Sequence, residues 1–414
     1  MSPHHIDRIA ALNDGISGVN GLSWGCIEPR PGDLSPLRGA KMQQLGAALK
    51  RHNRALQLNL RVDNPWALER DPTAPPSDLA GGNQHGTLLR IKPGYLANWR
   101  TAVRTLLQTL DVACLQIGCG AESEWLRVDG FIEALCAAYH AAKAVNPHIM
   151  VLAAGFDPAA YFAPGADADP LYASPAFQRK IAFVEHFLAQ ADGCYDVLTF
   201  HASRSYTAIQ PTVDWLQRGL VYQDGHKPIW IDDLFSGVWF DDPLVPPAVR
   251  ALAAGLESGE AEAVAQYRAL QARLLVKKTV EAFASGVERV FLSSDMDYAG
   301  TPAWRHAGLL DAEGNPKPAY HTYKLLIAQL ERVTAVHRID QGIYQFRQPG
   351  GRQTLVAWDD VAPRTVNFAP WVDGGALRIT PIITAAGVDT PHTITQRSYQ
   401  VALDANPVFV TTEG

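Results

Sequence analysis

The sequence predicts a (β/α)8 barrel, the TIM-barrel fold, followed by a small C-terminal β-sandwich, on three observations. Strand-like and helix-like runs alternate from the start of the chain to about residue 332. The strand-like runs are continuously apolar, which is typical of parallel strands buried on both faces. After about Val333 only short β-type runs with turn residues between them remain. Regular alternation over this length favours a barrel over an open sheet, and no GxGxxG motif follows any strand-like run.

Seven apolar runs in the barrel region have strand character. They cover residues 17–25, 56–63, 113–118, 148–155, 195–201, 228–233 and 287–294. Helical periods separate them, beginning with Ile6, Ile9 and Leu12 and recurring over residues 37–53, 95–110, 130–145, 177–191, 212–220, 261–284 and 319–333. We expect a loop rich in Pro, Gly and Asp over residues 64–93, and a second long loop over residues 156–176.

The first of the eight barrel strands is missing from this count. The chain opens inside what reads as the first helix, so no residues are left to form a strand before it. Either the start is truncated relative to a full barrel, or the barrel closes irregularly. We favour the first alternative.

The C-terminal region has a different sequence pattern. Its β-type runs are GIYQFRQ, QTLVAWDD, RTVNFAP, ALRITPII and PVFVTT, with turn residues between them. Because no helical period survives, we predict a barrel domain over residues 1–332 and a β-sandwich domain over residues 333–414.

Composition excludes several partners. The formal net charge is −6 and both signs are spread along the chain, so we expect no nucleic-acid partner. No run reaches the ~18 apolar residues of a membrane span, so we expect no membrane partner. The N-terminus lacks the apolar core of a signal peptide, which predicts a cytoplasmic protein as written, or an exported one if the start is truncated. The five cysteines form no CxxC pair, and we expect buried free thiols.

Polar and aromatic residues gather where the predicted strands end. In a (β/α)8 barrel the reactive groups lie at the C-terminal ends of the strands and in the loops that follow. Carboxylates beside Trp, Tyr and His suit a sugar site, because aromatic faces stack on pyranose rings and carboxylates supply acid, base or nucleophile. The residues selected in this way are Trp24, Glu28, Asp63, Asn64, Trp66, Glu122, Glu124, Asp157, His201, Arg204, Tyr206, Asp232, Asp233, Asp295 and Asp297.

The sequence motifs of a catalytic metal site and of a serine nucleophile are both missing from the predicted strands and turns. A catalytic metal in a barrel usually uses a His-x-His pair on a strand, and no strand here carries one. A serine nucleophile has no GxSxG turn to support it. We therefore expect no metal and no other cofactor.

Several segments resemble the retaining glycoside hydrolases of clan A, which are (β/α)8 glycosidases with two catalytic carboxylates. The segments are WGCIEPRPGDLSP, LQIGCG, YDVLTFHASRSY, KPIWIDDLFSG, GLLDAEGNPKPAYHTYKLL and the closing NPVFV. The resemblance covers nearly the whole chain. It implies a carbohydrate substrate or ligand, with Trp24, Glu28, Asp63, Trp66, His201, Arg204, Tyr206, Asp232 and Asp295 as substrate-binding residues.

The departures from the family fall on the catalytic positions. Where the family's fourth strand ends in Asn-Glu, this chain has Cys119 and Gly120, so Glu122 and Glu124 are the nearest candidates for the general acid. The nucleophile position aligns with Asp233, whose side chain is one methylene, roughly 1.5 Å, shorter than a glutamate, and a misplacement near 1 Å can cost about a hundredfold in rate.

These departures leave two functions open. The first is a glycosidase that uses Glu122 or Glu124 with Asp233, and the wider separation of such a pair favours inversion of the anomeric centre. The second is a degenerate barrel that keeps the aromatic cleft and acts as a glycan-binding or scaffold protein.

Overall fold

The computed structural model describes most of the chain. The described residues are 16–38, 55–70, 88–125, 127–157, 174–220, 227–240, 245–297 and 302–412, together with the single positions Gln44, Ala47 and Arg51. The helix expected around Ile9 lies outside the described residues. So do most of the helix expected over residues 37–53 and most of the loop over residues 156–176.

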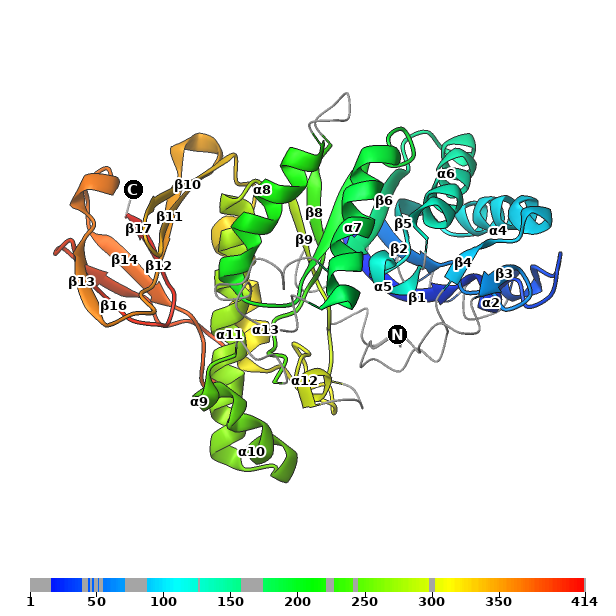
Figure 1. Ribbon diagram of the computed structural model, residues 1–414. Helices are drawn as coiled ribbons and strands as arrows, with labels where there is room; N and C mark the ends of the chain where they lie inside the picture. Colours follow the sequence, from blue (N-terminus) through cyan, green and yellow to red (C-terminus); the bar gives the residue numbers. More distant parts are fainter. Residues whose placement is uncertain are drawn as a thin grey trace. The chain divides into compact units, whose positions relative to one another are not determined.

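Seven strands form one curled, half-barrel sheet, and their order in the sheet follows the chain (Figure 1). The pairings of β1 with β2, β2 with β5, β5 with β6 and β6 with β7 are parallel. The strands are β1 (Ile16–Ser23), β2 (Ala55–Arg61), β5 (Val112–Ile117), β6 (Met150–Phe156), β7 (Val197–Ala202), β8 (Ile229–Leu234) and β9 (Arg289–Leu292). They match the seven predicted runs, so the predicted fold class is confirmed. All residues of β2 from Leu56 to Leu60 are buried, although the polar Gln57 and Asn59 alternate with the leucines.

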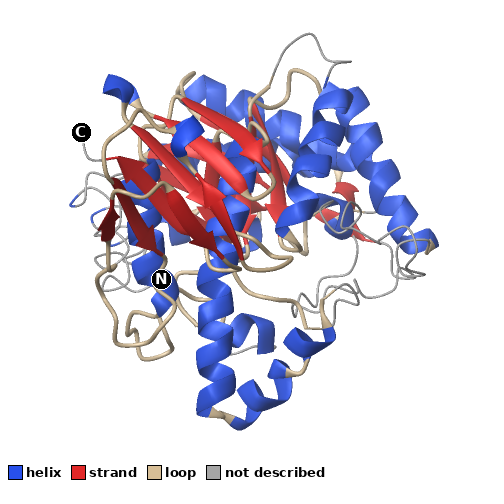
Figure 2. Cartoon of the chain, turned by 90° about the vertical axis from the view of Figure 1, so that its left-hand side faces the viewer, coloured by secondary structure: helices blue, strands red, loops and turns tan. Residues whose placement is uncertain are grey.

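Helices follow the strands along the chain. Figure 2 draws the helices in blue and the strands in red. In α4 the residues at helical spacing, such as Trp99, Val103 and Leu106, are the buried ones. The α-helices of the barrel region are α2 (Trp24–Ile27), α4 (Leu96–Thr109), α5 (Ala121–Glu124), α6 (Val128–Val145), α7 (Pro175–Gln190), α8 (Ile209–Leu220), α9 (Pro247–Arg250), α10 (Leu252–Ser258), α11 (Ala261–Ala284), α12 (Pro302–Arg305) and α13 (Pro318–Leu330). Among the described residues, no helix is long and apolar enough to span a membrane.

The loop expected over residues 64–93 contains secondary structure at both ends. Strand β3 (Leu68–Arg70) pairs antiparallel with β4 (Leu88–Ile91). This strand pair was not predicted, because its two strands are short and the segment between them is rich in Pro and Gly.

Contacts divide the chain into two compact units. The first comprises residues 1–201, 211–233 and 287–291, and the second comprises residues 202–210, 234–286 and 292–414. The second unit therefore contains α11 and α13 as well as the C-terminal sheets. The predicted domain boundary between residues 332 and 333 stays a prediction.

The C-terminal strands form the predicted antiparallel sandwich. A six-stranded sheet in the order β10-β11-β12-β17-β14-β15 accompanies the pair β13-β16. The strands are β10 (Ala335–Asp340), β11 (Ile343–Arg347), β12 (Gln353–Ala357), β13 (Arg364–Asn367), β14 (Leu377–Pro381), β15 (Ile394–Gln396), β16 (Gln400–Leu403) and β17 (Val408–Thr412). Leu355 and Val410 from the larger sheet share one core with Val401 and Leu403 from the smaller pair.

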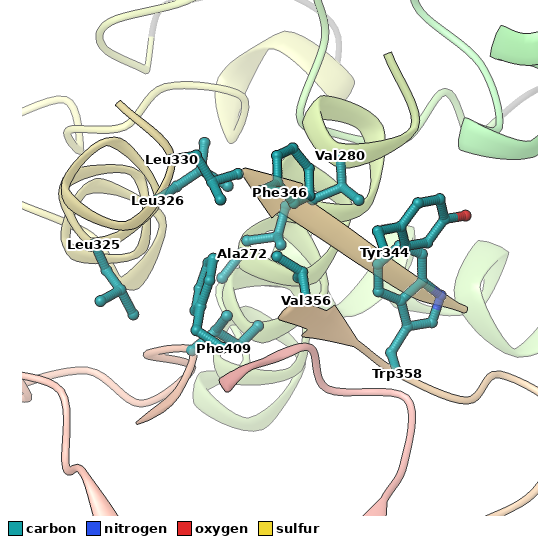
Figure 3. Packing of buried hydrophobic residues seen from close by; sticks show 12 residues of the cluster. Ala272, Val280, Leu325, Leu326, Leu330, Tyr344, Phe346, Val356, Trp358 and Phe409 are labelled. Atoms are coloured by element: carbon teal, nitrogen blue, oxygen red, sulfur yellow. The ribbon is translucent and has the colours of Figure 1, made fainter. Parts of the chain in front are cut away.

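The other face of the six-stranded sheet packs against two helices of the same unit. Phe346, Val356 and Phe409 lie in one cluster with Val280 of α11 and Leu326 of α13 (Figure 3). Alternate residues of a strand point to opposite faces of the sheet, so β11 and β12 contribute to both cores. The sandwich is therefore packed on both faces of its larger sheet.

Two of the five cysteines form a disulfide. Cys136 on α6 bonds to Cys194, which follows α7, and their Cα atoms are 4.6 Å apart. The prediction of buried free thiols is wrong for these two residues, because partners far apart in sequence leave no local pattern. It is also wrong for Cys26, which is a free but exposed thiol.

Candidate functional site

The loop after β1 is organised by a buried glutamate. The Glu28 carboxylate accepts hydrogen bonds from Trp24 Nε1 at 2.7 Å, from the Gly32 backbone N–H at 2.7 Å and from Asn98 Nδ2 at 2.9 Å. Trp24 has no exposed surface and Glu28 almost none. This pair therefore packs and shapes the loop, and Trp24 has no face available for the sugar contact predicted from the sequence.

Trp66 is the partly exposed member of the same aromatic group. Its ring contacts Trp24 at 5.3 Å and Tyr95 at 4.9 Å, both edge-on, and its Nε1 donates to the carbonyl oxygen of Glu28. Asn64 Nδ2 donates to the same carbonyl oxygen. The indole is fixed at its edge and partly exposed, and its role as a sugar-stacking residue stays a prediction.

Two ion pairs lie at the C-terminal end of β2. Arg61 Nη2 is 2.8 Å from Glu124 Oε1, and Arg70 Nη2 is 2.7 Å from Asp63 Oδ1. Burial raises the pKa of Glu124 to about 7, and Asp63 and Glu122 add to this effect while Arg61 opposes it. A carboxyl group with this pKa is partly protonated at neutral pH, which is the state required of a general acid.

Glu122 lies on the same short helix, α5, but has different neighbours. Its Oε1 accepts from the Asp157 backbone N–H at 3.2 Å, and its side chain is almost completely buried. Burial raises its pKa, Lys180 opposes this, and the Asp157 carboxylate adds to it. The two glutamates nearest the vacant family position therefore lie in separate electrostatic surroundings.

A polar group of side chains lies inside the barrel, where β5, β7 and β8 end. Asp232 Oδ2 accepts a hydrogen bond from Gln116 Nε2 and lies 3.5 Å from His201 Nε2. Cys119 Sγ is 3.7 Å from the same His201 nitrogen. Burial lowers the pKa of His201, but Asp232 and Cys119 outweigh this and raise it well above 6.5.

The Cys119, His201 and Asp232 side chains do not form a nucleophilic triad. In such a triad the imidazole faces the nucleophile with one ring nitrogen and the carboxylate with the other. Here Cys119 Sγ and Asp232 Oδ2 both face Nε2 of His201. Burial also raises the pKa of the Cys119 thiol, so the reactive thiolate is disfavoured.

Asp233 follows Asp232 on β8 and is less buried. The charges of both aspartates act on Cys119, and that of Asp233 has the larger effect on its pKa. Cys119 therefore lies within electrostatic reach of Asp233. The role of Asp233 as nucleophile stays a prediction.

The remaining predicted residues belong to the second compact unit. Tyr206 lies in a single 3-10 turn (Tyr206–Ala208), where its hydroxyl donates to Asp360 and its ring contacts Trp358 edge-on at 6.0 Å. The structure thus gives Tyr206 a contact with the sandwich, which its sequence position beside His201 did not predict. Asp295 follows β9 and is partly exposed, and its carbonyl oxygen accepts from the Leu310 backbone N–H.

Arg204 lies over an aromatic group that the sequence analysis did not single out. Its guanidinium carbon is 5.8 Å from the Trp239 ring centroid. Phe235 stacks on Trp239 at 5.2 Å, and Trp304 meets both rings edge-on at 5.1 and 5.6 Å. The sequence signal was weak because Trp304 lies far along the chain from the other two rings.

Gln116 and Arg61 were also missed. Gln116 is completely buried in the middle of an apolar strand, and a polar residue in that setting is a usable sequence signal. Arg61 ends β2 and looks like an ordinary strand-end charge. Within the part of the chain that the structure describes, no three His, Cys, Asp or Glu side chains are placed to hold a metal ion.

Comparisons with known proteins give structural matches only. No protein-family model matches the chain, and no curated protein matches it in sequence. A family 39 glycoside hydrolase from the gut symbiont Bacteroides cellulosilyticus WH2 is similar in structure, with a TM-score of 0.64 and 14% identity, over 99% of this chain and 78% of that one.

Two further solved structures have the same architecture. A family 30 endoxylanase from Clostridium papyrosolvens C71 matches with a TM-score of 0.53 and 11% identity, over 100% of this chain and 93% of that one. A GH5_18 protein from Streptomyces cattleya, solved in complex with GlcNAc, matches with a TM-score of 0.52 and 14% identity, over 81% of this chain and 76% of that one. The chain therefore has the fold of the clan A glycoside hydrolases.

Proposed function

We propose that this protein is a glycoside hydrolase that cleaves a glycosidic bond of an oligo- or polysaccharide, with Glu124 as general acid and Asp233 as nucleophile or base. The observation that carries the proposal is the pKa of Glu124, about 7, on the turn that follows β5. The strand corresponds to the one that bears the acid in the family that the sequence resembles. Glu124, four residues after the vacant position, is thus partly protonated at neutral pH, although its ion pair with Arg61 favours the charged form.

The neighbouring groups support this assignment. Arg61 Nη2 lies 2.8 Å from Glu124 Oε1 and stabilises the carboxylate that remains after the proton has been transferred. Asp233 lies on β8, and its charge reaches Cys119. Trp66 offers a partly exposed ring after β2, where a pyranose ring can stack. The glycoside-hydrolase fold and the GlcNAc bound to the Streptomyces cattleya protein favour a carbohydrate ligand.

The stereochemical outcome follows from the separation of the two carboxyl groups. Retaining glycosidases place them about 5–5.5 Å apart, and inverting ones about 6.5–9.5 Å apart. Asp233 is one methylene shorter than a glutamate, and Glu124 is displaced along the chain from the usual position. Both changes widen the gap, so we propose inversion. Proton NMR of the first-formed sugar tests this, and a product with the anomeric configuration of the substrate would refute it.

A substrate screen tests the hydrolase itself. The purified protein is incubated with aryl glycosides and with xylan, mannan and glucan oligosaccharides, alongside Glu124→Gln and Asp233→Asn. We expect kcat to fall by roughly a thousandfold or more in both variants. Glu122→Gln is the matched control on the same helix and retains most activity. Equal activity in wild type, Glu124→Gln and Asp233→Asn would sink the assignment.

A second function is favoured by Cys119. A thiol with a raised pKa stands where the family has an asparagine, and Gly120 stands where it has the acid. A barrel with this substitution can bind a glycan without cleaving it. Calorimetric binding of an oligosaccharide that is recovered intact after prolonged incubation would support this function over hydrolysis.

A further inference from the structure

The two consecutive aspartates of β8 have different surroundings. Asp232 is 5% exposed and makes a hydrogen bond and an ion pair inside the barrel, whereas Asp233 is less buried. Successive residues of a strand point to opposite sides, so the pair cannot present both carboxylates in the same way.

Asp232 accepts a hydrogen bond from a side chain that a second hydrogen bond fixes in place. Gln116 Nε2 donates to Asp232 Oδ2, and Gln116 Oε1 accepts from Gln57 Nε2 at 2.8 Å. The bond from Gln57 requires the Gln116 carbonyl oxygen on its own side, so the NH2 group faces the carboxylate. Both glutamines are buried, and neither has solvent as an alternative partner.

His201 is the second group that faces Asp232 Oδ2. Its Nε2 lies 3.5 Å from that oxygen and 3.7 Å from Cys119 Sγ. The titratable groups around this imidazole are Asp232 from β8 and Cys119 from the loop after β5, with Asp233 reaching Cys119 electrostatically. Asp232 is therefore the carboxylate that neutralises a buried imidazolium.

Gly155 leaves the space in which Asp232, His201 and Gln116 approach one another. Strand β6 shifts register against β7 between Ala153 and Phe156, and Gly155 has a φ of +51° at this bulge. A Cβ at position 155 would lie under 3.0 Å from Asp232 Oδ2, His201 Nε2 and Gln116 Nε2. The three polar groups therefore converge on the space that the missing side chain leaves open.

The bulge is fixed by its own backbone bonds. The Gly155 N–H donates to Thr199 Oγ1 at 2.9 Å, and its carbonyl oxygen accepts from the Gly120 N–H at 2.9 Å. Gly120 occupies the family's acid position. The backbone N–H of Gly120 is thus hydrogen-bonded to Gly155, the residue next to which Asp232, His201 and Gln116 meet.

We infer that Asp232 is a positioning residue, which Gln116 and the bulge at Gly155 hold against His201. This contact concerns the free protein and stands without any activity. That it orients His201 toward a sugar rests on the proposed function.

An NMR titration of the histidine side chains tests the contact between Asp232 and His201. The protein is labelled with ¹⁵N, the His201 signal is assigned by its loss in His201→Gln, and the pH is varied without substrate. We expect wild-type His201 to titrate above 6.5. In Asp232→Asn its pKa falls by more than about one pH unit, because burial is no longer offset.

Three further variants sharpen the test. Gly155→Ala is expected to lower the His201 pKa as Asp232→Asn does, since the added Cβ separates the groups. Asp233→Asn is expected to change it by less than half as much. Cys114→Ala, on the same face of β5 but in the apolar layer, controls for general disturbance of the strand and leaves the pKa unchanged. Should Gly155→Ala fail to fold, the near-isosteric Asp232→Asn still decides.

The inference is overturned if wild-type His201 titrates at or below 6.5, or if Asp233→Asn lowers its pKa as much as Asp232→Asn. Neither result depends on turnover. A protein that cleaves no glycoside but shows the expected titration refutes the proposed hydrolase and leaves the positioning role of Asp232 intact.

Discussion

At the scale of single residues, Glu124 determines how the proposed activity depends on pH. Its pKa of about 7 means that the proton needed by a departing sugar oxygen is lost as the pH rises through that value. We expect kcat of the wild-type protein to fall about tenfold per pH unit above pH 7, measured on a glycoside with a poor leaving group.

The control for this pH dependence is Glu122→Gln, which should keep an alkaline limb, moved to lower pH because the Glu122 charge contributes to the raised pKa of Glu124. Glu124→Gln should show low activity without that limb, because the titrating group is gone. A wild-type profile that stays flat to pH 9 would exclude Glu124 as the acid.

Glu28 gives a prediction about stability at the same scale. Its two carboxylate oxygens accept three hydrogen bonds from buried or partly buried donors. In Glu28→Gln an NH2 group must face at least one of these donors, at a cost of about 1–3 kcal/mol in the free energy of unfolding. Urea unfolding measures this, with Glu69→Gln in the exposed Glu69–Arg90 pair as the control. That control should change stability by less than about 0.5 kcal/mol.

At the scale of secondary-structure elements, the disulfide ties α6 to the turn that precedes β7. The bond between Cys136 and Cys194 spans a sequence separation of 58 residues. Restricting a loop of that length in the unfolded chain stabilises the fold by about 4 kcal/mol in the chain-entropy account.

Replacing both of these cysteines with serine should therefore lower the free energy of unfolding by a few kcal/mol, and dithiothreitol should destabilise only the wild type. Cys26→Ser is the control, because Cys26 is exposed and free. Identical unfolding curves for wild type with and without reductant would contradict the prediction.

At the scale of the whole molecule, the six-stranded sheet shares a core with two helices of the barrel region. Phe346 of β11 and Val280 of α11 lie in one buried cluster (Figure 3). We expect Phe346→Ala to cost about 3–5 kcal/mol. A double-mutant cycle with Val280→Ala should give a coupling energy of about 0.5–3 kcal/mol, as for residues that share a core.

The exposed Val361 supplies the matched control for that cycle. Val361→Ala should change stability by less than about 0.5 kcal/mol and should not couple to Val280→Ala. A coupling energy of zero between Phe346 and Val280 would mean that the sandwich unfolds independently of α11, as the predicted boundary at residue 332 would allow.

The elements of the fold were predictable because their signals are local. A continuously apolar run such as the one in β6 predicts a buried parallel strand, and α11 begins and ends where its helical pattern predicts. The disulfide and the β3–β4 hairpin were missed because each joins segments that are far apart in sequence or short.

For the site, the sequence determined which strand ends carry carboxylates. It also determined that Cys119 and Gly120 align with the Asn-Glu of the family that the chain resembles. It could not determine which side chains meet. That depends on a one-residue register shift at Gly155, on the burial of Trp24 and Glu28, and on which side of β8 each aspartate faces. These are properties of packing between strands. His201 and Asp232 come within 3.5 Å of each other only when β5, β6, β7 and β8 lie side by side in the sheet.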